Sequence, residues 1–105
     1  MNNEILTNIR AAVTANVNAA VAANSKLRLM GWSARDGASA ASTIDIVNGA
    51  TGAAAGKVVR INVAAAGDNT YMFPGDGIGC PLGISVDFLT GDVDLILYYK
   101  FATTT

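Results

Sequence analysis

LGISVDFLTGDVDLILYYK, residues 82–100, is the stretch that decides the fold class. Apolar residues recur at every second position on both sides of Thr90 and Gly91, and a period of two is typical of β-strands. A turn at these two residues would form a hairpin in which Phe88 pairs with Val93. Each residue before Phe88 would then pair with a residue after Val93. Because one face of this hairpin is wholly apolar, the sequence predicts a mainly β protein.

The other face of the expected hairpin carries two carboxylates directly opposite each other. The register pairs Asp87 with Asp94, and like charges at about 5 Å across a strand pair repel each other. Four kinds of compensation are open: solvation, a cation of the same chain from Arg60 or Lys57, a basic group of a second subunit, or a bound divalent cation. We therefore treat both aspartates as candidate interface residues.

Short strands bounded by turn residues recur along the rest of the chain. They are expected at residues 27–35, 43–47, 57–63 and 70–73. The first alternates Leu27, Leu29, Gly31 and Ser33 on one face with Arg28, Met30, Trp32 and Ala34 on the other. The glycine-rich segment 74–81 is interpreted as a turn and not as a phosphate-binding loop, because no helix follows it. Six to eight strands without intervening helices predict an antiparallel β-sandwich or jelly-roll-like domain over residues 25–105.

Residues 1–24 form a separate arm, rich in alanine, asparagine and valine. Its branched apolar residues recur every four positions, at Ile5, Ile9, Val13, Val17 and Val21. This spacing favours a helix over residues 4–12. Residues 13–22 also alternate with a period of two, and here a strand is preferred, with the chain returning antiparallel from Lys26. The arm is expected to serve assembly or docking, so that the β domain folds without it.

Composition excludes several classes of partner. The 105 residues carry a net charge of −1 with only 14% charged residues, which provides no basic patch for nucleic acid or an anionic membrane. No apolar run reaches the roughly 18–20 residues of a membrane span, and the opening Met-Asn-Asn-Glu lacks the basic start of a signal peptide. Since 51% of the residues are hydrophobic, self-association or docking onto a larger assembly is expected.

The residue types present do not form a recognisable catalytic set. Histidine is absent, which removes the usual general base and the commonest metal ligand. Cys80 is the only cysteine and is interpreted as a buried thiol. The sequence therefore predicts no catalytic group, no cofactor and no metal site, and the protein is not expected to be an enzyme.

The aromatic residues allow two interpretations. Trp32, Tyr71, Phe73, Tyr98 and Tyr99 could line the core or an interface, or they could form a platform for sugar rings. An exposed coplanar pair among Trp32, Tyr71, Tyr98 and Tyr99 would favour the platform. In the expected hairpin Tyr98 lies opposite Gly83 and covers a bare strand position. Four cationic residues, Arg28, Lys57, Arg60 and Lys100, are expected to stand singly on strand exteriors as edge or interface charges.

Several segments together resemble a known class of protein. They are LRLMGWSARDGASAA at residues 27–41, NGATG at residues 48–52, KVVRINVAAAG at residues 57–67 and GIGCPLGISVDF at residues 77–88. This part of the chain resembles the small β-sandwich virion proteins of tailed bacteriophages, which decorate or cement the capsid or form short head fibres. The arm lies outside the resemblance.

The resemblance implies a non-enzymatic virion component on the capsid exterior, made in the host cytoplasm. It implies a homo-oligomer, with a trimer as the best single expectation, and the major capsid protein as partner. The alternative is a carbohydrate- or receptor-binding module of a phage fibre. The candidate interface residues are Ile5, Ile9, Val13, Val17, Trp32, Arg60, Asp87, Asp94 and Tyr98.

Overall fold

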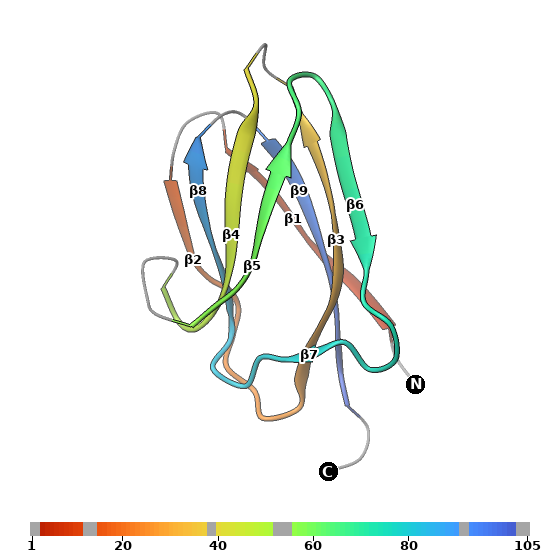
Figure 1. Ribbon diagram of the computed structural model, residues 1–105. Helices are drawn as coiled ribbons and strands as arrows, with labels where there is room; N and C mark the ends of the chain where they lie inside the picture. Colours follow the sequence, from red (N-terminus) through yellow and green to blue (C-terminus); the bar gives the residue numbers. More distant parts are fainter. Residues whose placement is uncertain (1–2, 12–14, 38–39, 52–55, 91–92, 103–105) are drawn as a thin grey trace.

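The computed structural model is an all-β sandwich of two antiparallel sheets, as the sequence predicted (Figure 1). It describes residues 3–11, 15–37, 40–51, 56–90 and 93–102. For the described residues up to residue 20, it describes the backbone alone. The strands are β1 (Asn3–Ala11), β2 (Ala15–Val21), β3 (Leu27–Asp36), β4 (Ser42–Asn48), β5 (Lys57–Val63), β6 (Asp68–Met72), β7 (Ile78–Gly79), β8 (Ile84–Thr90) and β9 (Val93–Phe101). The first sheet has the order β1-β9-β3-β6, with β7 also paired to β3, and the second sheet has the order β2-β8-β4-β5.

The hairpin expected from residues 82–100 is wrong, because its two strands belong to different sheets. β8 pairs with β2 and β4, whereas β9 pairs with β1 and β3. Six fully buried side chains nevertheless alternate along these strands as expected: Ile84, Val86, Phe88, Val93, Leu95 and Leu97. They belong to the one core that both sheets enclose, so they meet between the sheets and not along one face of a hairpin. The alternation of apolar residues identifies which side chains are buried. It does not identify which strands are hydrogen-bonded neighbours in a sheet.

The expected helix over residues 4–12 is also wrong, because residues 3–11 form β1. The strand expected within residues 13–22 is confirmed for Ala15–Val21. It does not pair with the strand that follows Lys26, however. β1 lies on β9 and β2 lies on β8, so these strands add one edge to each sheet. The unpaired edges of β9 and β8 provide backbone partners that outweigh the weak helical preference of this segment.

A β-bulge changes the faces of β3. The register on β9 shifts between Leu29 and Gly31, so that Trp32 and Ala34 point into the core together with Leu29. The expectation of unbroken alternation through residues 27–35 is therefore wrong after Met30. An extra residue in one strand produces such a switch.

Gly31 occupies a crowded position in the first sheet. A Cβ atom there would overlap the Tyr71 carbonyl oxygen and lie 2.7 Å from the Met72 sulfur atom. Gly31 is also the strand partner of Tyr98. Tyr98 therefore lies opposite a glycine, as expected, but the glycine is Gly31 and not Gly83.

The loop before β8 confirms two local expectations. Gly75 and Gly77 both have positive φ angles, as a turn built from glycines requires. Cys80 is fully buried in the core, and this burial raises the pKa of its thiol. In the part of the chain that the structure describes, no helix is long and apolar enough to cross a membrane.

Candidate functional site

The outer face of the second sheet carries a cluster of four charged side chains, Asp45, Arg60, Lys57 and Asp87, which we call the Asp45 cluster. On β4, Asp45 lies between Ile44 and Ile46, whose side chains enter the core. Because successive side chains of a strand point to opposite faces, the Asp45 carboxylate points outward. Its strand partners are Arg60 on β5 and Asp87 on β8.

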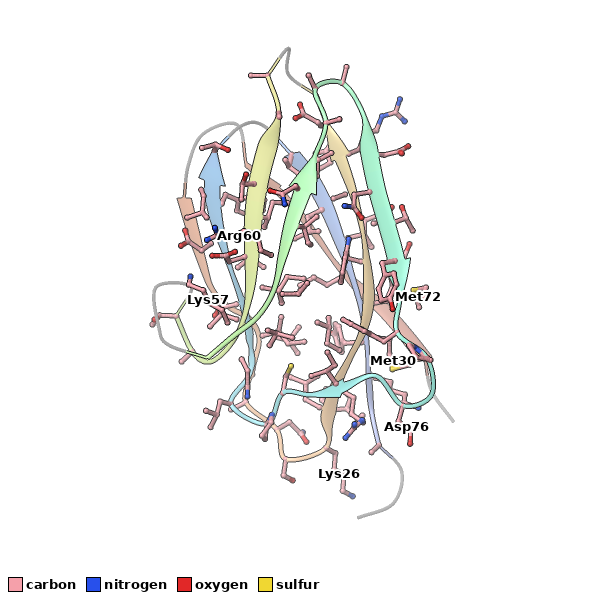
Figure 2. All side chains as sticks on the ribbon, in the orientation of Figure 1. Lys26, Met30, Lys57, Arg60, Met72 and Asp76 are labelled. Atoms are coloured by element: carbon pink, nitrogen blue, oxygen red, sulfur yellow. The ribbon has the colours of Figure 1, made fainter. Side chains whose placement is uncertain are left out.

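Two cations hold the Asp45 carboxylate. Arg60 donates from Nε to Oδ1 at 2.8 Å and from Nη2 to Oδ2 at 3.0 Å, a bidentate pair. Lys57 Nζ lies 3.0 Å from Oδ2, and both cationic side chains reach over the second sheet (Figure 2). The Asp45 side chain is 1% exposed, whereas those of Arg60 and Lys57 are about half exposed. A desolvated anion is thus covered by two partly hydrated cations.

This environment keeps Asp45 ionised. The hydrogen bonding from Arg60 lowers the pKa of the Asp45 carboxyl below its ordinary value, and Lys57 lowers it further, while burial acts in the opposite direction. Both carboxylate oxygens of Asp45 already accept hydrogen bonds from Arg60, and Oδ2 is also paired with Lys57. A carboxylate with a lowered pKa is a weak base. The Asp45 cluster is therefore suited to fixing the register of β4 and β5, not to moving protons.

The expected Asp87–Asp94 pair is wrong, because the two aspartates lie in different sheets. Asp87 instead faces Asp45 across β8 and β4, so a pair of opposed carboxylates does exist. Lys57 lies 3.9 Å from Asp87 and 3.0 Å from Asp45. The expectation that a cation of the same chain lies near Asp87 is confirmed for Lys57.

Replacing Asp45 with asparagine is expected to lower the free energy of unfolding by about 1–3 kcal/mol, because charged hydrogen bonds to a buried group are lost. The native pKa of Asp45 is below its unfolded value near 3.9, so its contribution is present above that pH and is lost as the pH falls through the native pKa. Urea unfolding of the variant should therefore show a weaker pH dependence below about pH 4.

Asp87→Asn is the matched control, since it removes a carboxylate from the same face. It should change stability by less than about 0.5 kcal/mol or raise it slightly, because it relieves the repulsion with Asp45. Equal losses in the two variants would contradict the special role of Asp45.

Asp94 belongs to a row of alternating charges on the first sheet. Successive strand partners across β1, β9, β3 and β6 are Arg10, Asp94, Arg35 and Asp68. Opposite charges at facing positions favour this register over its neighbours. The alignment of β1 on β9 therefore places a cationic residue at the position that faces Asp94.

Arg28 and Lys100 were expected to stand singly, but they meet at the glycine-rich loop. Lys100 Nζ lies 2.9 Å from Asp76 Oδ1, and Arg28 donates to the carbonyl oxygens of Asp76 and Gly77 at 2.6 and 3.3 Å. The ion pair with Lys100 lowers the pKa of the Asp76 carboxyl. These contacts fasten the loop to β3 and β9.

Three aromatic rings cluster where β6 borders β3. Trp32 is 6% exposed, its ring centroid lies 5.3 Å from that of Tyr71 at an interplanar angle of 34°, and Phe73 packs edge-on against both rings. Trp32 Nε1 donates to Asn69 Oδ1 at 3.2 Å. Because Trp32 is buried and tilted against Tyr71, these two rings do not form the exposed coplanar pair that a sugar platform needs.

The predicted interface residues do not converge on one surface. Ile5 and Ile9 lie on β1 with Tyr98 and Leu95 as strand partners, and Val17 lies on β2 opposite Val86. Val13 lies outside the described residues. Arg60 and Asp87 share the outer face of the second sheet, whereas Asp94 and Tyr98 belong to the first sheet.

Sequence reasoning missed Asp45 altogether. The available signal was a carboxylate between two isoleucines in a strand. Such a residue needs a cation beside it if the strand is central, because a buried carboxylate is costly without a partner. Comparisons with known proteins add no further guide, since no protein family, no curated protein and no solved structure matches this chain.

Proposed function

We propose that this protein is a non-enzymatic structural component of a tailed-phage virion, which decorates or cements the capsid exterior as a homo-oligomer, with a trimer as the expected form. The support from the sequence is the resemblance of residues 26–100 to small virion β-sandwich proteins. The small two-sheet sandwich agrees with that resemblance.

The observation that carries the proposal is the exposed apolar edge at β6. Tyr71 and Met72 lie on opposite faces of β6 and are 47% and 52% exposed, with Met72 labelled in Figure 2. Among the described strands, β6 pairs with β3 alone. An edge strand offers free backbone donors and acceptors to another protein chain. Beneath Tyr71, the packed rings of Trp32 and Phe73 hold this edge in place.

The edge is also braced from the second sheet. Asn69 Nδ2 donates to the Asn62 carbonyl oxygen at 3.0 Å, which links β6 to β5. A braced edge loses little conformational entropy on docking, so more of its contact energy remains as affinity. A protein that binds the assembled shell, and not its separate subunits, stabilises the shell by mass action.

The test is binding to empty shells assembled from the major capsid protein of the phage that encodes this chain. The double variant Tyr71→Thr, Met72→Thr should bind at least about tenfold more weakly in cosedimentation, because two anchors of an apolar contact are lost. Thermal unfolding should establish that the variant is folded.

Leu82→Thr is the matched control, since Leu82 is 61% exposed but lies in the loop before β8. It should bind the shells like the original protein. If the original protein does not cosediment with the shells, the proposed function is refuted. If the double variant binds as well as the control, the β6 edge is not the docking surface.

A further inference from the structure

β1 and β2 rest on a single stretch of the chain. In the described residues, β1 pairs only with β9, and β2 pairs only with β8. The strand β8 covers residues 84–90 and the strand β9 covers residues 93–101, so the two follow each other closely in the sequence. One end of the chain therefore supplies an edge strand to each sheet by lying along one other segment.

One exposed connection joins β2 to the remainder of the sandwich. Residues 22–26, AANSK, are all exposed and contain no proline. Three backbone hydrogen bonds tie this connection to its neighbours: Asn24 N to Pro81 O at 3.0 Å, Leu27 N to Asn24 O at 3.0 Å, and Ala102 N to Lys26 O at 2.8 Å. Opening this connection exposes little apolar surface and breaks few hydrogen bonds.

The registers of β1 and β2 match the charges of the strands that receive them. Arg10 is the strand partner of Asp94, which extends the row of alternating charges on the first sheet. Asn16 is the strand partner of Asp87, which places a neutral residue beside the carboxylates of the second sheet. A second copy of this chain carries the same matching residues, whereas an unrelated strand lacks them.

We propose that β1 and β2 exchange between copies, so that these strands of one copy lie on β9 and β8 of another. The exchange preserves every strand pairing of the closed form and changes only the path of residues 22–26. Reciprocal exchange closes a dimer, and cyclic exchange closes a trimer. This inference deepens the proposed function, because it rests on the homo-oligomer expected there and identifies the contact that builds it.

The test traps the exchanged pairing with cysteines. A tagged Asn8→Cys variant and an untagged Ile96→Cys variant are mixed in urea, refolded together and oxidised with copper phenanthroline. Asn8 and Ile96 are strand partners, and facing Cα atoms at about 4.5–5.5 Å permit a disulfide. Exchange should give a tagged–untagged heterodimer as the main covalent product on a non-reducing gel. Cys80 is fully buried and should remain reduced.

The control mixture pairs Asn8→Cys with Thr70→Cys, because Thr70 is exposed on β6 at the other edge of the first sheet. Exchange predicts at least fivefold more heterodimer from the first mixture than from the control. Equal yields would overturn the proposal. The crosslinking experiment uses the isolated protein. Equal yields would therefore not contradict capsid binding through β6, and a failure to bind shells would not contradict strand exchange.

Discussion

Replacing Phe88 with alanine is expected to lower the free energy of unfolding by about 3–5 kcal/mol. Phe88 is fully buried on β8, where its strand partners are Ile44 on β4 and Ala15 on β2. Removing the ring loses its transfer free energy and leaves a cavity between two sheets that cannot close on it. A domain of this size has roughly 5–15 kcal/mol of total stability, so the loss is a large share of it.

Thermal and urea unfolding measure this effect. Each kcal/mol corresponds to roughly 4–8 °C in the melting temperature of a small domain, so a fall of more than about 12 °C is expected. Leu82→Ala is the control, since Leu82 is 61% exposed and should cost less than about 0.5 kcal/mol. A similar small loss in both variants would mean that the two sheets do not enclose Phe88.

The sequence was informative about burial and less so about strand pairing. Alternation predicted that Val86 and Phe88 on β8, and Leu95 and Leu97 on β9, are buried, and all four are. A hairpin and a crossing between sheets bury the same residues, so the pattern could not choose between them. The choice depends on which strands complete each sheet, and this is a long-range property of the chain.

Local irregularities and charges account for the other differences. The bulge at Met30 turns Trp32 inward, and no residue type in this strand marks that position in advance. Lys57 and Arg60 were identified as cations near a carboxylate, but Asp45 was not identified as the group they share. Finding it required the register of β4 against β5, which places Arg60 opposite Asp45.

Deleting residues 1–24 is expected to lower the melting temperature by at least about 15 °C or to abolish cooperative unfolding. The sequence alone suggested that the β domain folds without this segment. In the structure the deletion removes one edge strand from each sheet and uncovers the backbones of β9 and β8, and it also removes the contacts of the buried Val21. Unpaired edges next to a core lose hydrogen bonds and invite aggregation.

A synthetic peptide of residues 1–24 provides the decisive comparison. If β1 and β2 are integral strands, adding the peptide in excess should restore the cooperative transition, because bound peptide stabilises the folded form by mass action. A scrambled peptide of the same composition should not, because its residues cannot place Arg10 opposite Asp94. An unchanged melting temperature after the deletion, with no response to either peptide, would instead establish that residues 25–105 form an independent domain.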